Sequence, residues 1–143
     1  MSRGFESTRP SPRVALQFDR ADRRYLPGQP LAVQYEIDGI GDETIRAVEH
    51  SVLWYTEGKG EEDLGIHHFE RLTERSRFPP AVRVAGFATH LPGSPLSYEG
   101  IIVKIRWCVR VRIFFQTAKD FVSEHVFELG TVPPARVPTT AAP

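Results

Sequence analysis

The sequence lacks several features that mark particular classes of protein. Its single cysteine, Cys108, cannot form an intrachain disulfide. It has no excess charge of either sign: 18 Lys and Arg residues balance 18 Asp and Glu residues, whereas nucleic-acid and membrane-surface binders usually carry a basic excess. No window approaches the roughly 20 apolar residues of a membrane-spanning helix. No stretch longer than a few residues has helical apolar spacing. We therefore expect no nucleic-acid partner and no integral membrane association.

The size and composition fit one globular domain with flanking tails. The chain has 143 residues, of which 41% are hydrophobic and 25% are charged. A domain of this size buries roughly two-thirds of the surface that its unfolded chain exposes, so a core can form without disulfides or metal. The first residues, MSRGFESTRPSP, contain no apolar signal core. Together with the single cysteine, this leads us to expect a cytoplasmic protein.

The segment from 101 to 115 alternates apolar and mostly basic side chains with a period of two residues. Successive side chains of a β-strand point to opposite faces, whereas a helix would scatter both sets around its circumference. The pattern predicts one long strand with an apolar face and a basic face. The expected apolar face carries Ile101, Val103, Ile105, Trp107, Val109, Val111 and Ile113, and the opposite face carries Ile102, Lys104, Arg106, Cys108, Arg110 and Arg112.

Similar segments precede and follow this strand, with turn signals between them. Pro27-Gly28, for example, suits a type II turn in which Gly28 takes a positive φ. This arrangement predicts an all-β fold, an antiparallel immunoglobulin-like β-sandwich of about seven strands. The sandwich is expected to span 13–130, between a flexible N-terminal tail at 1–12 and a Pro/Ala-rich disordered tail at 131–143. The expected strands are 13–19, 31–38, 45–56, 64–72, 82–91, 101–115 and 121–129.

The last two expected strands can be aligned as a hairpin. Placing Phe115 opposite Phe121 brings Arg112 opposite Glu124 and keeps the apolar residues of both strands on one face. Opposite charges then lie adjacent or diagonal on the other face. We therefore predict this register.

Three passages resemble the arrestin-fold family. Residues 25–31, YLPGQPL, resemble the proline-glycine entry into a strand. In the run 87–110, LPGSPLSYEG precedes a strand of the IxVxIxWxVxV type, as arrestin-related proteins place a proline-serine turn before their central strand. The passage 53–58, LWYTEG, is consistent with the same family. The resemblance covers 13–130 and implies one arrestin N-terminal-type domain.

Arrestins, and the retromer subunit that shares their fold, have two such domains, whereas this sequence contains one. Families of this type are adaptors rather than enzymes. The resemblance therefore implies a non-enzymatic adaptor or scaffold that binds another protein. We expect contact through loops or through an exposed sheet edge, which an extended peptide can lengthen. Edge strands can also join two copies of the chain into a homo-oligomer.

An aromatic pair next to an acidic loop is the first candidate contact site. Trp54 and Tyr55 are neighbours in an expected strand and point to opposite faces, so one of them can reach the surface beside the loop 57–63. Exposed Tyr and Trp side chains bury a large area with little loss of entropy. The candidate partner-binding residues are Tyr55, Glu57, Lys59, Glu61, Glu62 and Asp63.

The basic face of the long strand is the second candidate site. Guanidinium groups bind phosphate bidentately, so this face can receive a phosphorylated peptide or a lipid headgroup. The competing interpretation is a solvated face neutralised by Glu124 and Glu128. A small-ligand or phosphate-binding module is therefore the alternative function. Its candidate anion-binding residues are Lys104, Arg106, Arg110 and Arg112.

Catalytic and metal sites have less support. Of the five histidines, His67 and His68 are adjacent in an expected strand and point to opposite faces, so they cannot chelate one ion as a pair. We expect no metal site and no cofactor, and we expect the other histidines, His50, His90 and His125, at the surface or the core margin. Cys108 lies mid-strand and is expected to be structural rather than nucleophilic. An enzyme with a metal or cysteine site is thus the third alternative, and no catalytic residue is assigned.

Overall fold

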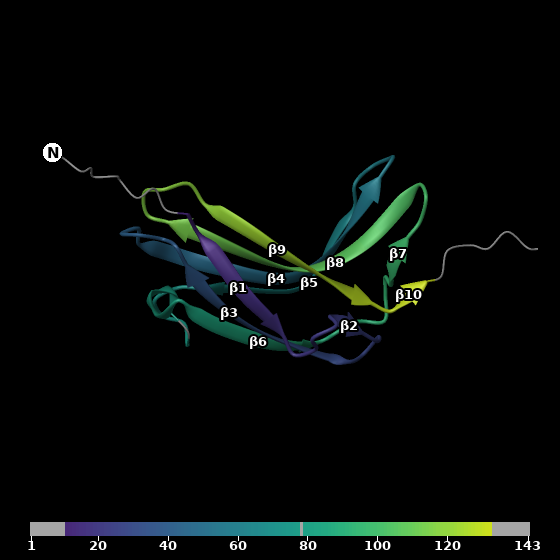
Figure 1. Ribbon diagram of the computed structural model, residues 1–143, viewed down its shortest axis with the longest axis horizontal. Helices are drawn as coiled ribbons and strands as arrows, with labels where there is room; N and C mark the ends of the chain where they lie inside the picture. Colours follow the sequence, from purple (N-terminus) through teal and green to yellow (C-terminus); the bar gives the residue numbers. More distant parts are fainter. Residues whose placement is uncertain (1–10, 78, 133–143) are drawn as a thin grey trace, which may run out of the picture.

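The two longest strands, β4 (Ile45–Gly58) and β8 (Val103–Phe115), pair antiparallel along their full length and form the middle of a large sheet. The computed structural model describes residues 11–77 and 79–132 (Figure 1). Beyond β4 the sheet ends at β5 (Leu64–Leu72), which pairs antiparallel with it. β8 therefore lies inside the sheet, and β5 lies at its edge.

The other edge of β8 is shared by two strands. β7 pairs with the first residues of β8 and β9 pairs with the following ones, both in antiparallel orientation. Two short strands run parallel to these, β2 beside the end of β9 and β10 beside β7. The bounds are β7 (Ser97–Glu99), β9 (Phe121–Leu129), β2 (Arg24–Tyr25) and β10 (Thr131–Val132).

A small sheet of three antiparallel strands, in the order β1–β3–β6, covers one face of the large sheet. Figure 1 shows the two sheets stacked, with the start of β8 and the end of β4 bending away from the small sheet. The fold is an all-β sandwich, which confirms the predicted class. Its remaining elements are β1 (Arg13–Phe18), β3 (Pro30–Asp38), the 3-10 turn η1 (Pro80–Val82) and β6 (Val84–His90).

The core lies between the sheets and depends on the alternation predicted for β8. Trp107, Val109 and Val111 are at most 1% exposed and belong to one cluster with buried residues of β3 such as Leu31. The Trp107 indole N–H donates a hydrogen bond of 2.7 Å to the carbonyl of Pro95. Alternate residues of β8 point away from this core. The large sheet thus has a second face, which the small sheet does not cover.

Two details of the predicted long strand are wrong. β8 begins at Val103, and Ile101 lies in the bend before it, fully exposed rather than on the apolar face. The register with β9 differs by two residues from the prediction, because Arg110 rather than Arg112 lies opposite Glu124. A shift of two residues keeps every side chain on its face, so apolar alternation cannot distinguish the two registers.

A carboxylate from the β3–β4 connection holds the turn between β8 and β9. The Glu43 side chain accepts hydrogen bonds from the Thr117 hydroxyl at 2.7 Å and from the backbone N–H groups of Thr117 and Ala118 at 3.2 and 3.1 Å. The hydroxyl bond is the main cause that lowers the pKa of Glu43. The last pair of the hairpin is Ile113 with Phe121, so the turn is wider than predicted.

The predicted type II turn is confirmed. Gly28 has a φ of +81°, a conformation that favours glycine, and the N–H of Gln29 donates to the carbonyl of Leu26 at 3.1 Å. The predicted C-terminal tail starts at 131, but its first two residues form β10. The rest of that tail and residues 1–10 of the N-terminal tail lie outside the described residues. In the part of the chain that the structure describes, no helix is long and apolar enough to cross a membrane.

Candidate functional site

The face of the large sheet that points away from the small sheet, here called the outer face, carries residues of both predicted sites. Directly paired residues of an antiparallel sheet share a face. Leu53 of β4 pairs with Ile66 of β5 and with Cys108 of β8. Cys108 in turn pairs with Val126 of β9. Leu53 and Cys108 are buried but lie outside the core cluster, because they are on the outer face. We call these four residues the apolar row.

The apolar row is closed in the middle and open at its ends. Leu53 and Cys108 are 1% and 0% exposed, whereas Ile66 is 60% and Val126 is 41% exposed. Phe69 of β5 is 53% exposed and pairs with Ser51, which is on the same face as Leu53. Exposed apolar side chains that gather on one edge strand often mark an interaction surface. We call Ile66 and Phe69 the β5 patch.

A β-bulge brings the two residues of the β5 patch to the same face. Ile66 and Phe69 are three residues apart, and regular alternation would send them to opposite faces. His67 has no partner in the pairing between β4 and β5. This extra residue puts the side chain of Phe69 on the outer face, together with that of Ile66. Sequence analysis missed the patch for this reason. The one available signal was the His67-His68 pair, which interrupts the alternation of β5.

Every predicted anion-binding residue of β8 is paired with a carboxylate. Arg106 donates a hydrogen bond to Glu57, and this bond is the main cause that raises the pKa of Arg106. Glu124 neutralises this face as predicted, but Glu128 instead contacts Arg24, at 3.4 Å. The ion pairs are Arg110–Glu124 at 2.6 Å, Arg112–Asp120 at 3.2 Å, Arg106–Glu57 at 3.2 Å, Arg106–Glu99 at 3.1 Å and Lys104–Glu99 at 3.5 Å. An anion that bound here would have to displace a carboxylate.

A hollow of about 400 Å³ on the outer face is the place where the two predicted sites meet, since Tyr55 and Arg110 both line it. The hairpin beside it is closed by two hydrogen bonds, from the N–H of Asp63 to the Thr56 hydroxyl at 2.8 Å and from the N–H of Thr56 to the Asp63 carbonyl at 3.0 Å. The lining residues are Tyr55, Thr56, Glu57, Glu62, Asp63, Leu64, Arg110 and Glu124. The predicted residues outside this lining are Lys59, Glu61, Lys104, Arg106 and Arg112.

Of the two neighbouring aromatic residues in β4, Tyr55 is the one on the outer face. Trp54 packs against the core cluster and lies over Gly65 of β5, where any side chain would collide with its indole ring. Burial raises the pKa of Tyr55, with smaller contributions from Cys108 and Glu124, so its hydroxyl stays protonated and can donate a hydrogen bond. Of these two neighbours, Tyr55 is therefore the one available to a partner on the outer face.

Cys108 has the environment of a structural residue, as predicted. Its side chain is fully buried in the apolar row. Burial, followed by the charge of Glu124, raises the pKa of Cys108 to about 12. The thiolate is the nucleophilic form of cysteine, and it is absent at neutral pH with such a pKa.

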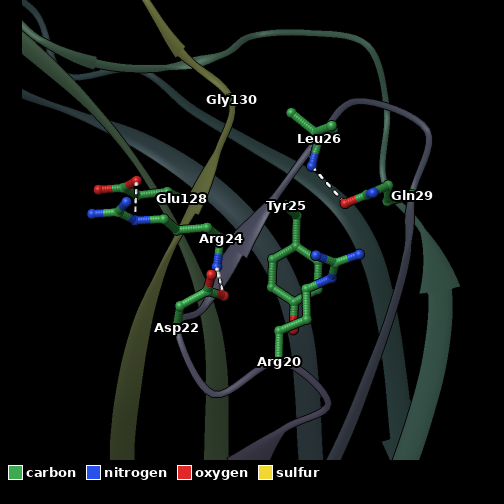
Figure 2. A pocket seen from close by; sticks show the side chains of 8 residues that line it. All are labelled: Arg20, Asp22, Arg24, Tyr25, Leu26, Gln29, Glu128 and Gly130. Atoms are coloured by element: carbon green, nitrogen blue, oxygen red, sulfur yellow. Dashed lines mark hydrogen bonds and ion pairs between the residues drawn. The ribbon is translucent and has the colours of Figure 1, made fainter.

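A second hollow, of about 540 Å³, lies where β2 meets β9 and was not predicted (Figure 2). Arg24 and Glu128, which both line it, form an ion pair at 3.4 Å. Asp22 accepts a hydrogen bond of 3.1 Å from the N–H of Arg24. Figure 2 shows Arg20 alongside the ring of Tyr25, and the guanidinium carbon is 5.6 Å from the ring centroid. These contacts hold the loop together and leave few polar groups for a ligand.

The histidines form a third polar site, at the margin of the core. His50 is fully buried, and one of its ring nitrogens lies within 4.8 Å of one donor atom each of His68 and Glu70. The adjacency of His67 and His68 in the sequence gives no sign of this grouping. The grouping depends instead on His68 and Glu70, which share a face two residues apart, and on their position beside His50 across the β4–β5 pairing.

Comparison with known proteins identifies the fold but no family. No protein-family model and no curated protein sequence matches the chain. Among solved structures it is similar to Spo0M, a sporulation control protein from Bacillus subtilis, with a TM-score of 0.56 and 14% sequence identity. The similarity covers 82% of this chain and 49% of Spo0M, so the chain spans about half the length of that protein. At this identity the comparison supports the arrestin-like β-sandwich fold alone.

Proposed function

We propose that this domain is a non-enzymatic adaptor or scaffold that binds another protein through the outer face of its large sheet. The observation that carries the proposal is the β5 patch, which includes Ile66, the exposed end of the apolar row on β5. Burying exposed apolar surface of this kind is the main driving force for association between proteins. The arrestin-like fold adds support by analogy, since the families it resembles are adaptors.

The position of β5 suits an extended segment of the partner. β5 is the end strand of the large sheet and, among the described residues, pairs only with β4. The backbone along the other edge of such a strand can pair with an added strand. A segment bound there would place alternate side chains next to Ile66 and Phe69. Main-chain hydrogen bonds would then provide affinity, and the apolar contacts would provide specificity.

The acidic loop after β4 supports a partner with basic residues near its apolar contact. Glu61, Glu62 and Asp63 form no ion pair within the ranges that the structure describes. Two of them line the hollow that contains Tyr55. Such a negative rim steers a positively charged partner and fixes its orientation more than it adds affinity.

We do not propose the anion-binding alternative, because each cation of β8 already has a carboxylate partner. For the compartment we propose the cytoplasm, since a single cysteine suits a reducing environment. The partner is proposed to be a different protein, with a second copy of the chain as the alternative. Light scattering on the purified chain distinguishes the two, because self-pairing would give a dimer.

The proposal is tested by affinity capture from a native lysate with the tagged chain and two variants. Ile66→Glu combined with Phe69→Glu places charge in the β5 patch. Val84→Glu is the matched control, because Val84 is an exposed apolar residue on β6 of the small sheet. A protein that is captured by the original chain and the control, and lost with the folded double variant, is the expected result. Equal recovery with all three chains would contradict the proposal.

A further inference from the structure

Three potential metal ligands converge where the edge strand β5 meets the core. His50 comes from β4, and His68 and Glu70 come from β5. The Nε2 atom of His50 lies 2.9 Å from a carboxylate oxygen of Glu70, and one donor atom of each residue lies within 4.8 Å of the other two. Two imidazoles and a carboxylate are a donor set that suits zinc. This site is independent of the outer face and of the proposed function.

Neighbouring residues fix the orientation of His50. Its Nδ1 atom is 2.8 Å from the hydroxyl of Tyr35 in β3, which directs Nε2 towards Glu70. Phe87 of β6 stacks on His50 with ring centroids 4.3 Å apart, and on His68 at 5.0 Å. Metal-binding histidines usually have a hydrogen-bond partner on the second ring nitrogen and a packed environment. His50 has both.

The Nε2 atom of His68 is the observation that points to a ligand. It is buried, and it is the one buried side-chain nitrogen or oxygen atom without a hydrogen-bond partner in the described part of the chain. Buried polar atoms in proteins are nearly always paired, and an unpaired one is destabilising. A cation between His68 and His50 would give this nitrogen a partner.

The remaining groups of the site are compatible with a cation. The Nδ1 atom of His50 can donate its hydrogen to the Tyr35 hydroxyl, which leaves the lone pair of Nε2 for an ion that replaces the hydrogen bond with Glu70. Glu70 brings a carboxylate whose side chain is 51% exposed, which leaves an entry path from solvent. The neighbouring His67 has a different role, because its Nε2 atom is 2.8 Å from the carbonyl oxygen of His90.

We propose that His50, His68 and Glu70 bind one zinc ion, with water as the fourth ligand. Zinc takes nitrogen ligands at about 2.0 Å in a tetrahedron, which places donor atoms about 3.3 Å apart. The donors of His50 and Glu70 are already 2.9 Å apart, so the donor of His68 is the one that must approach, by up to about 1.5 Å from the 4.8 Å limit that the geometry sets. Rotation of the partly exposed side chains of His68 and Glu70 accomplishes this while His50 stays fixed. The ion would tie the edge strand to β4.

Zinc binding is measured by titration calorimetry on the full chain without an affinity tag, after treatment with a chelator. One equivalent of zinc is expected to bind, and His68→Ala and Glu70→Gln are each expected to weaken binding by at least about 10-fold. His90→Gln is the control, because His90 is exposed and its side chain lies outside the site. It should bind zinc like the original chain. Circular dichroism confirms that each variant is folded.

Two further readouts make the test decisive. Zinc should raise the melting temperature of the original chain and of His90→Gln but not of His68→Ala. Cobalt(II), which takes the same geometry, should give the visible absorption of a tetrahedral nitrogen and oxygen site. The absence of saturable zinc binding by the original chain, or equal affinity of the chain and His68→Ala, would overturn the proposal.

Discussion

The outer face and the histidine cluster, which consists of His50, His68 and Glu70, both combine polar with apolar groups but leave different groups unsatisfied. On the outer face, each cation of β8 has a carboxylate within 3.5 Å, so apolar area remains available. In the cluster, aromatic rings pack closely and one nitrogen of His68 remains unpaired. The outer face therefore suits a protein partner, and the histidine cluster suits a cation.

One strand links the two regions. β5 points Ile66 and Phe69 to the outer face and His68 and Glu70 towards the histidine cluster. The bulge at His67 allows this distribution, because it separates Ile66 from the other three residues and puts Ile66 on the same face as Phe69. A substitution in β5 can therefore affect both regions, whereas a substitution in β4 or β8 can be chosen to affect only one of them.

The largest effect is expected at the buried end of the histidine cluster. His50→Ala removes a fully buried ring, creates a cavity beside Phe87 and leaves the Tyr35 hydroxyl without its partner. We expect a loss of about 3 kcal/mol in the free energy of unfolding, measured by urea denaturation with a chelator present. His90→Ala, at an exposed histidine, should change it by less than about 0.5 kcal/mol. Similar losses for both variants would contradict the structural importance of His50.

The next largest effect is expected from the difference in burial between the middle and the end of the apolar row. Leu53→Ala should lower the free energy of unfolding by about 2 kcal/mol, since Leu53 is buried although it lies on the outer face. Ile66→Ala, in the same row, should lower it by only about 0.5 kcal/mol because the side chain is largely exposed. Equal losses would mean that Ile66 is needed for folding and is not kept for a partner.

A decrease in pH is expected to weaken the cluster. Burial lowers the pKa of His50 and His68 from 6.5, and Glu70 opposes part of that shift. Between pH 6.5 and the lowered pKa values the unfolded chain binds more protons than the folded chain. The contribution of these histidines to stability is therefore constant above about pH 7, falls as the pH drops below 6.5, and levels off below the lowered pKa values. Urea denaturation at several pH values, with chelator, measures this. The free energy of unfolding should depend less strongly on pH in His68→Gln. Some dependence should remain, because the pKa of His125 is also lowered. An unchanged slope would contradict the account.

The smallest effect is expected for the ion pairs of the outer face. A double-mutant cycle on Arg110 and Glu124, which are 2.6 Å apart and partly exposed, should give a coupling energy of about 0.2 to 1 kcal/mol. A coupling well above that range would show that the pair is structural. Neither single variant, Arg110→Ala or Glu124→Ala, should abolish capture of a protein partner.

Alternation of apolar residues was sufficient to predict most strands and the sandwich. It located β5 and β9 at their observed bounds and predicted the inward direction of Trp107. It missed β2, β7 and β10, because strands this short contain too few residues for a periodic pattern. It also could not determine the β8–β9 register, since a shift of two residues changes no face.

The candidate sites were less predictable because they depend on which strands are neighbours. Tyr55 and Arg110 are far apart in the chain, and only the β4–β8 pairing brings them to one hollow. The carboxylates that neutralise β8 come from several other segments, so the basic pattern of the sequence overstated the charge of this face. The His67 bulge hid the β5 patch, and the histidine cluster depends on the β4–β5 pairing, which the sequence does not show.

Site-specific photo-crosslinking tests the central claim, that the outer face is the contact surface, most directly. A benzophenone side chain is introduced in place of Phe69 in one chain and in place of Val84 in another, since both positions are exposed and lie on different sheets. After illumination in lysate, the account predicts that the captured partner is linked covalently at position 69 and not at position 84. Linkage at position 84 alone, or at both positions equally, would contradict it.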